Sequence, residues 1–253
     1  MQVENTAAIV TGGASGLGAA TAAALAAKGA TVFAFDLAFS IEKAPAVAGV
    51  HYVPVDVTDA EQVREAVATA ANAGVPLRTV VNCAGIGTAS RILNKAGEVN
   101  DLALYAKVVQ INLIGSYNVL ALAAEQIAKT PELEHGARGV VINTASVAAF
   151  EGQVGQAAYS SSKGGILGLQ LPAARDLAQY GIRVNTIAPG IVETPMLAGV
   201  SEEFQKTLAA GVPFPKRLAR PDEYAQLACF LVEHDYINGE VVRMDGALRM
   251  APR

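Results

Sequence analysis

The chain has 253 residues, of which 52% are hydrophobic and 17% charged, with a net charge of −4 and a mean hydropathy of +0.33. This composition excludes a disordered protein, and an acidic chain without a basic stripe is not expected to bind nucleic acid. Globular proteins usually carry about 25% charged residues, so we expect either a large core or a surface that is partly buried in an oligomer.

The hydrophobic pattern predicts short buried strands that alternate with longer helices. In chain order, the strands are expected at Ala7–Thr11, Thr31–Asp36, His51–Val55, Thr79–Asn82, Val140–Thr144, Arg183–Ile187 and Glu240–Arg243. The helices are expected at Gly16–Lys28, Asp59–Asn72, Asn100–Lys129, Ala157–Gln179 and Pro221–Val232. This alternation predicts one α/β domain over residues 1–253, with a doubly wound, parallel, seven-stranded sheet and helices on both faces.

Two helix boundaries have local signals. Lys28-Gly29 predicts the end of the first helix, and Thr58 with Glu61 predicts a capping box at the start of the second. Pro172 is expected to kink or break the helix Ala157–Gln179.

A glycine-rich loop, Thr11-Gly12-Gly13-Ala14-Ser15-Gly16-Leu17-Gly18, joins the first strand to the first helix. Gly12 permits a tight turn, Gly16 lets the backbone approach a pyrophosphate, and Gly18 lets the helix pack on the sheet. The pattern predicts that a dinucleotide is bound by Gly12, Ser15, Gly16, Leu17 and Gly18. No lysine follows Gly18, which counts against an ATP-binding P-loop.

An acidic residue ends the second strand and indicates which dinucleotide is preferred. The Asp36 carboxylate can accept hydrogen bonds from ribose hydroxyls and would repel a 2′-phosphate. No arginine lies between Val32 and Ser40 to neutralise that charge, so NAD is expected rather than NADP. Further cofactor contacts are predicted after the third strand, at Asp56 and Val57, and after the fourth, at Cys83, Ala84 and Gly85.

Ser146 follows the fifth strand, and Tyr159 and Lys163 lie four residues apart on one face of the next helix. A phenol needs a pKa about three units below its usual value near 10 to act as a base at neutral pH. The Lys163 ammonium and a cationic nicotinamide would together supply that shift. We therefore predict Ser146, Tyr159 and Lys163 as catalytic residues, with Asn112 holding a water that links Lys163 to solvent.

With these motifs, the whole chain resembles the classical short-chain dehydrogenases/reductases, whose fold is of the Rossmann type. The resemblance implies that Ser146, Tyr159 and Lys163 form the catalytic triad, that Asn112 is its fourth member, and that Tyr159 and Lys163 also contact the cofactor. It further implies that the segment after the sixth strand lies against the nicotinamide, through Pro189, Gly190, Val192 and Thr194, with Thr194 at the carboxamide.

Residues 142–159, 212–218, 238–241 and 245–247 resemble the subgroup of type II 3-hydroxyacyl-CoA dehydrogenases, also described as 17β-hydroxysteroid dehydrogenases type 10. The resemblance implies interconversion of a 3-hydroxyacyl-CoA and a 3-oxoacyl-CoA. Ser146, Gln153, Gln156 and Tyr159 are the predicted substrate contacts, under a lid around residues 195–215 that includes Gly199 and Val200. The basic residues Lys216, Arg217 and Arg220 either meet CoA phosphates or form a solvated turn.

Other functions stay open at this point. A hydroxysteroid or other secondary-alcohol dehydrogenase and a 3-oxoacyl-carrier-protein reductase fit the same motifs, although the reductase normally uses NADPH. An inactive dinucleotide sensor would be expected to have lost one of the three catalytic residues.

No metal site is expected, because the three histidines have no ligand spacing, and Cys83 and Cys229 are expected to be reduced, buried thiols. The N-terminus has no basic signal region, and the longest apolar runs are shorter than a bilayer span, so a cytoplasmic protein without membrane contact is expected. The apolar segment Asn100–Lys129 and the low charge predict a homotetramer.

Overall fold

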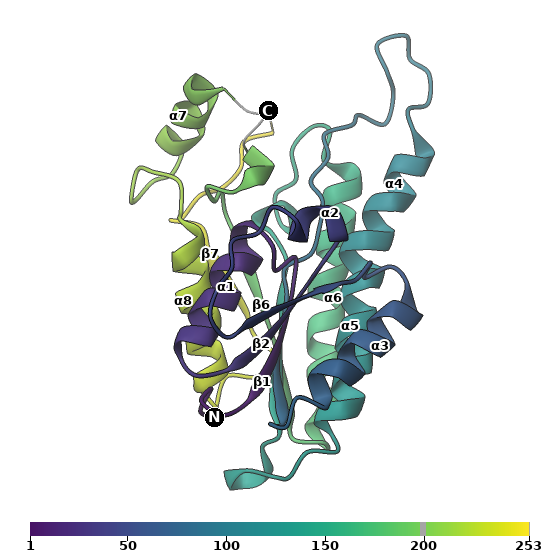
Figure 1. Ribbon diagram of the computed structural model, residues 1–253. Helices are drawn as coiled ribbons and strands as arrows, with labels where there is room; N and C mark the ends of the chain where they lie inside the picture. Colours follow the sequence, from purple (N-terminus) through teal and green to yellow (C-terminus); the bar gives the residue numbers. More distant parts are fainter. Residues whose placement is uncertain (198–200, 253) are drawn as a thin grey trace.

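The computed structural model describes residues 1–197 and 201–252, and within them one parallel sheet of seven strands forms the centre of the molecule (Figure 1). The strand order is β3-β2-β1-β4-β5-β6-β7. Their bounds are β1 Ala7–Thr11, β2 Thr31–Asp36, β3 Val50–Pro54, β4 Leu77–Asn82, β5 Gly139–Thr144, β6 Ile182–Pro189 and β7 Val241–Met244. The predicted strands and the doubly wound sheet are confirmed, with ends displaced by one or two residues. The order reverses between β1 and β4, where such sheets bind their ligands.

Helices cover both faces of the sheet, as Figure 1 shows. The longer ones are α1 Gly16–Ala27, α3 Ala60–Ala71, α4 Leu102–Val109, α5 Ser116–Ile127, α6 Ala157–Ala178 and α8 Pro221–Glu233. The helices α1 and α8 share one hydrophobic cluster, and α3, α5 and α6 share the other, on the opposite face. The strands β1, β4, β5 and β6 are buried along their whole length, because both of their faces are covered.

The predicted helix Asn100–Lys129 is interrupted. A π-turn, η1 Gln110–Gly115, separates α4 from α5. By length and composition alone, Leu102–Ile127 could cross a membrane, but 44% of its most apolar window is buried inside the protein. The inner side of this segment packs against α3, α6 and β4. Many of its apolar residues are therefore core residues of the protein.

Two local expectations are corrected. The α6 helix runs through Pro172 to Ala178 without a break. Both Pro172 and Gly168, whose carbonyl loses its helical donor, are exposed, so water can satisfy that carbonyl. At the start of α3, Asp59 rather than Thr58 is the cap, because its carboxylate accepts hydrogen bonds from the amides of Glu61 and Gln62.

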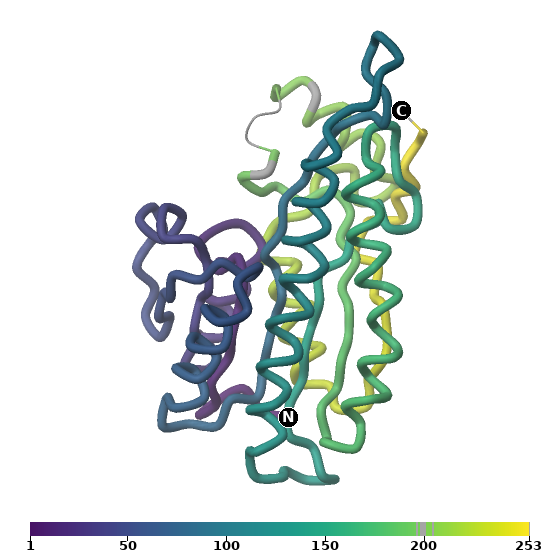
Figure 2. Tube along the Cα trace, turned by 90° about the vertical axis from the view of Figure 1, so that its right-hand side faces the viewer, coloured from purple at the N-terminus to yellow at the C-terminus, as the bar shows by residue number. Residues whose placement is uncertain are grey.

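Segments at the upper end of Figures 1 and 2 form the rim of the sheet. They include the extended loop between β4 and α4, the short helices η4 Pro195–Leu197 and α7 Glu202–Ala210, and the C-terminal tail. The predicted lid thus contains helices in its described part, while Gly199 and Val200 lie outside the described residues, as do the side chains of Met196 and Phe204.

Candidate active site

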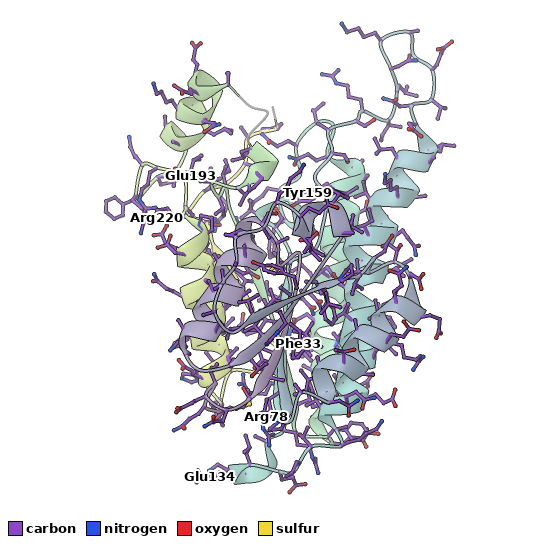
Figure 3. All side chains as sticks on the ribbon, viewed as in Figure 1. Phe33, Arg78, Glu134, Tyr159, Glu193 and Arg220 are labelled. Carbon is purple, nitrogen blue, oxygen red and sulfur yellow. The ribbon has the colours of Figure 1, made fainter. Side chains whose placement is uncertain are left out.

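The predicted site residues gather at the carboxyl ends of the strands. Figure 3 shows Tyr159 and Glu193 at this end of the molecule, below α7, whereas Arg78 and Glu134 lie at the opposite end. Parallel strands end at the same edge, so the loops after β1, β2, β4, β5 and β6 meet there.

The glycine loop has the close packing that its sequence predicts. Gly12 and Gly16 have positive φ angles of 64° and 52°, which favour glycine. A Cβ on Gly12 would lie 2.9 Å from the amide nitrogen of Ala84, and a Cβ on Gly18 would overlap the carbonyl oxygen of Gly12. The nearest atoms to a Cβ on Gly16, by contrast, belong to Thr194 and Pro195 at 3.5 Å. The bare backbone at Gly16, at the start of α1, therefore fits a pyrophosphate group.

The Asp36 carboxylate is fixed beside this loop. One oxygen accepts a hydrogen bond from the amide of Ala14 at 3.0 Å, and the other accepts from the amide of Leu37 at 2.8 Å. Each carboxylate oxygen can accept a second bond, so Asp36 retains acceptors for two vicinal hydroxyl groups. This arrangement fits the ribose of a dinucleotide.

The end of β4 is tied to the end of β1 by a single hydroxyl. Thr11 Oγ1 accepts hydrogen bonds from the amides of Cys83 and Ala84, at 3.1 and 3.0 Å. A Cβ on Gly85 would lie 3.1 Å from Asn112 Oδ1 and 3.6 Å from Lys163 Nζ. The small residues thus leave space between the cofactor loop and the catalytic helix.

The side chains of Ser146 and Tyr159 lie close to each other across the junction of β5 and α6. Ser146 Oγ also accepts a hydrogen bond from the amide of Ala148 at 3.1 Å, which fixes the orientation of its side chain. Burial raises the pKa of the Tyr159 phenol, and the neighbouring Ser146 hydroxyl opposes that effect. The residues of the chain therefore do not by themselves make Tyr159 a base at neutral pH.

Lys163 is buried one helical turn beyond Tyr159. Its Nζ donates a hydrogen bond to the backbone carbonyl of Thr144 at 2.7 Å and lies 5.9 Å from the centre of the Tyr159 ring. Burial lowers the pKa of the Lys163 ammonium to about 8, and the nearby Cys83 opposes this shift. The carbonyl of Thr144 thus directly stabilises the positive charge of Lys163.

Asn112 lies in the π-turn η1 and is fully buried. Its Oδ1 accepts from the amide of Ile86 at 2.8 Å, while its Nδ2 donates to the Ile86 carbonyl and to Ser162 Oγ, both at 3.0 Å. The side chain connects the loop after β4 to α6. The water predicted beside it stays a prediction.

The segment at the end of β6 reaches the glycine loop. Pro189 is the last residue of β6, Gly190 donates to the carbonyl of Met244, and Val192 is buried and pairs with Ala219. The side chain of Thr194 faces the position where Gly16 would carry a Cβ. The predicted nicotinamide contacts are therefore assembled beside the predicted phosphate loop.

Other predicted contacts already have partners within the chain. The carboxylate of Asp56 accepts from the amide and hydroxyl of Thr58, and Val57 packs on Gly115 of the π-turn. Gln153 Nε2 donates to the carbonyl of Ala251, and Gln156 Oε1 accepts from the amide of Gln153. Their contacts with adenine or substrate stay predictions.

The basic turn before α8 forms ion pairs. Arg217 contacts both oxygens of Glu223 at 2.7 Å, and Arg220 contacts Asp222 at 3.1 Å. These two arginines therefore fit the alternative of a solvated turn, in which they pair with acidic residues of the same segment. Both cysteines are free: Cys229 is buried, and Cys83 is partly exposed as a residue although its thiol is buried.

The described residues contain no group of three or more His, Cys, Asp or Glu side chains placed to hold a metal ion. The chemistry of this site is instead that of a hydroxyl pair beside a buried ammonium, next to a cradle for a dinucleotide. This combination suits removal of a proton from an alcohol as hydride leaves the same carbon.

The profile of the short chain dehydrogenase family matches residues 6–205. The chain belongs to the short-chain dehydrogenase family. It is 48% identical to human 3-hydroxyacyl-CoA dehydrogenase type-2 over 99% of its own length and 97% of that protein. It is also 48% identical to the Drosophila melanogaster protein of the same name, with 99% and 100% covered.

Among solved structures, this short-chain dehydrogenase resembles 3-hydroxyacyl-CoA dehydrogenase type-2 from Mycobacterium avium, with a TM-score of 0.93 and 44% identity. The match covers 100% of this chain and 99% of that one. The resemblance inferred from the motifs is confirmed, and membership of the family implies a nicotinamide dinucleotide, NAD or NADP, as cofactor.

Sequence reasoning missed several residues of this short-chain dehydrogenase site. Thr11 and Ser162 lie inside the motifs themselves but have no separate signal for their roles as hydrogen-bond partners. Thr144 acts through its backbone carbonyl, which any residue would provide. Tyr224, whose phenol approaches the hydroxyl of Thr144 at 2.6 Å, lies on α8 among apolar residues, so its periodicity indicates only a buried position.

Proposed function

We propose that this protein interconverts 3-hydroxyacyl-CoA and 3-oxoacyl-CoA, with NAD as the hydride carrier. The observation that carries the proposal is the grouping of Ser146 and Tyr159 beside the buried Lys163, at the same edge as the glycine loop. Similarity over nearly the full length to dehydrogenases named for this substrate supports the choice of substrate.

In the proposed mechanism, the Tyr159 phenolate takes the proton of the substrate 3-hydroxyl group. Ser146 Oγ already accepts a hydrogen bond from the amide of Ala148, so its own proton is available to the substrate oxygen. Lys163 keeps a positive charge near the phenol and favours its ionised form. When bound, the oxidised cofactor supplies the hydride acceptor and a further positive charge.

The preference for NAD rests on Asp36. Its carboxylate is held in place by two backbone amides, so it cannot easily turn away from a ribose bound beside it. A 2′-phosphate at that position would meet a fixed negative charge in a partly buried site, which costs affinity. Asp36 thereby also disfavours a reductase that depends on NADPH.

The proposed substrate would enter between the lid and the loop after β5. Gln153 and Gln156 lie on that loop, six and three residues before Tyr159. The hydrogen bond from Gln153 to the carbonyl of Ala251 holds this loop against the C-terminal tail. Arg217 and Arg220 are engaged by acids, which leaves the exposed Lys216 as the cation of this turn that we propose for a CoA phosphate.

The test compares initial rates with acetoacetyl-CoA, a ketosteroid and an acetoacetyl carrier protein, each with NADH and with NADPH. The proposal expects kcat/KM to be highest for acetoacetyl-CoA with NADH, and the Asp36→Ser variant to lose much of its preference for NADH. A higher kcat/KM for either other substrate would replace the proposed substrate, and binding of NADH without any turnover would indicate a dinucleotide sensor.

We also propose a cytoplasmic homotetramer. Exposed apolar side chains on α4, η1, α5, α6 and α8 support the assembly: Leu102, Tyr105, Ile114, Tyr117, Leu171 and Phe230. The cytoplasmic location is proposed from the sequence alone, and fractionation of cells that express the intact gene would test it.

A further inference from the structure

A buried chain of polar groups lies behind the catalytic lysine, on the side of the sheet opposite to α6. It contains Cys83 after β4, Thr144 at the end of β5, and Tyr224 in the first turn of α8. Tyr224 is fully buried, and its ring belongs to the hydrophobic cluster of α1 and α8. A phenol is costly to bury without a hydrogen-bond partner, whereas a phenylalanine at this position would need none. The partners of the Tyr224 hydroxyl therefore indicate what it does.

The direction of each hydrogen bond follows from counting protons. Thr144 Oγ1 lies 2.6 Å from the carbonyl oxygen of Asn82, which can only accept, so the Thr144 proton points there. Tyr224 must then donate its proton to Thr144 Oγ1, at 2.6 Å. The thiol of Cys83 lies 3.7 Å from both the Tyr224 oxygen and Thr144 Oγ1, and it can donate its proton to either of them.

This order requires that both Cys83 and Tyr224 keep their protons. Burial raises the pKa of the Cys83 thiol and raises that of the Tyr224 phenol well above its ordinary value, so both groups are neutral at physiological pH. Every proton of the chain from Cys83 to Asn82 then has an acceptor. Such a chain is cooperative, since each donor polarises the next.

The chain ends on the residue that holds the lysine. Thr144 is bonded through its hydroxyl to Asn82 and Tyr224, and through its backbone carbonyl to Lys163 Nζ at 2.7 Å. The bonds of the Thr144 hydroxyl to β4 and α8 restrict rotation of the Thr144–Ala145 peptide group, whose amide is also bonded to the carbonyl of Ile187. The groups that face the Lys163 ammonium are this carbonyl, Cys83 from the end of β4, and Tyr159 from its own helix.

The helix that carries Tyr224 is itself fixed at its other end. Arg183, at the start of β6, donates to the carbonyls of Leu231, Val232 and Ile237, at and beyond the last turn of α8. With Arg183 at one end of the sheet and Tyr224 at the other, α8 has no freedom to shift along β5 and β6.

We propose that Tyr224 is a positioning residue for catalysis: through Thr144, its phenol aligns the carbonyl that holds the Lys163 ammonium beside Tyr159. This inference rests on the proposed dehydrogenase mechanism and adds α8 to the catalytic machinery. Loss of the phenol would leave the ammonium less stabilised, lower the pKa of Lys163, and so raise the pKa of Tyr159 as a base.

The test is the Tyr224→Phe variant, which keeps the ring and removes one hydroxyl. In alcohol oxidation we expect kcat to fall about threefold to tenfold, with KM for NAD changed less than twofold. The acid limb of the pH profile of kcat/KM should move to higher pH by a few tenths of a unit, because a base with a raised pKa loses its proton later. In the protein without cofactor, NMR titration of labelled lysine should show the Lys163 pKa, about 8 in the wild type, displaced downward.

Tyr52→Phe is the matched control. Its phenol donates one hydrogen bond, to the carbonyl of Pro45 at 2.8 Å, on the far edge of the sheet. It loses the same chemical group at a half-exposed site, so a smaller loss of melting temperature and an unchanged pH profile are expected. A Tyr224→Phe protein that loses only melting temperature, with the kinetics and Lys163 titration of the wild type, would overturn the proposal.

If the Tyr224→Phe variant does not fold, Thr144→Val tests the proposal instead. This substitution removes the hydroxyl at the other end of the same hydrogen bond. It should lower kcat and move the pH profile as Tyr224→Phe does, and Thr144→Ser should retain more activity than Thr144→Val. In a double variant the effects should not add, since both act through one hydrogen bond. The assay uses whichever secondary alcohol the wild type oxidises best, so a wrong acyl-CoA assignment does not affect this comparison.

Discussion

Burial acts on both members of the pair formed by Tyr159 and Lys163. It raises the pKa of the Tyr159 phenol and lowers that of the Lys163 ammonium to about 8. Both shifts have one cause, since charged forms are disfavoured where water is excluded. The positive charge of a bound oxidised cofactor is therefore needed to complete the activation, which couples deprotonation to binding.

Tyr159→Phe removes the phenol and leaves the cofactor site in place. We expect kcat to fall about a thousandfold, within the usual range for loss of a general base. The dissociation constant for NADH, measured by fluorescence, should change by less than about threefold. Substantial turnover by this variant would contradict the role of Tyr159, provided that contamination by wild-type enzyme is excluded by mass spectrometry.

Lys163→Met should change the pH dependence of stability. The folded-state pKa of Lys163 lies near 8 and the unfolded one near 10.5, so the unfolded chain binds more protons between these values. Wild-type stability therefore gains from this group as pH rises from 8 toward 10.5. At pH 7 the variant avoids the cost of burying a charged amine, so it should be more stable than the wild type by up to about 3 kcal/mol. Urea unfolding at pH 7 and pH 10 checks this: a difference that does not narrow at the higher pH would contradict it.

At the scale of elements, the junction of β1 and α1 shows how a glycine can be required by packing. Gly18 touches the carbonyl of Gly12 so closely that no side-chain atom fits between them. This contact sets the angle at which α1 leaves the sheet and therefore the position of its N-terminus beneath the phosphate site.

Gly18→Ala should therefore disturb both the fold and the cofactor site. We expect a loss of about 3 kcal/mol in the free energy of unfolding, at the upper end of overpacking effects, and at least a tenfold weaker affinity for NADH. Ala20→Gly is the matched control, because it changes the same helix by one methyl group and should cost only about 1 kcal/mol. Calorimetry and NADH titration compare the two, and equal effects would argue against the packing explanation.

The π-turn is a feature of α4 and α5 that hydrophobic spacing did not reveal. One additional residue per turn changes the period too little to be seen among so many apolar side chains. Its effect is local: Gly115 packs on Val57, and Asn112 turns its amide toward Ile86 and Ser162. These contacts hold the loop after β4 against α6.

At the scale of the whole molecule, apolar side chains remain exposed on helices that otherwise pack well. Leu102 is 74% exposed, Tyr117 52% and Phe230 51%. Together with the low charged fraction, these side chains favour assembly through helix faces rather than a larger core. Assembly would bury the outer side of the segment that is apolar enough to cross a membrane.

Sedimentation should show a tetramer of four 26.0 kDa chains, about 104 kDa, at micromolar concentration. Tyr117→Glu places a charge on the exposed side of α5 and should reduce the assembly to smaller species without unfolding the chain. Lys129→Glu, at the far end of the same segment, is a control for added negative charge. A single 26.0 kDa species for the wild type would refute the tetramer.

The sequence by itself determined the parallel sheet, the glycine loop with Asp36, and the pairing of Tyr159 with Lys163. Each of these follows from residues close together in the chain, where spacing and side-chain chemistry are sufficient. The tertiary structure alone decided which groups hold Lys163 in place. Thr144 and Tyr224 are 80 positions apart and Cys83 and Tyr224 are 141 apart, so only the packing of α8 against the sheet brings these hydroxyl and thiol groups together.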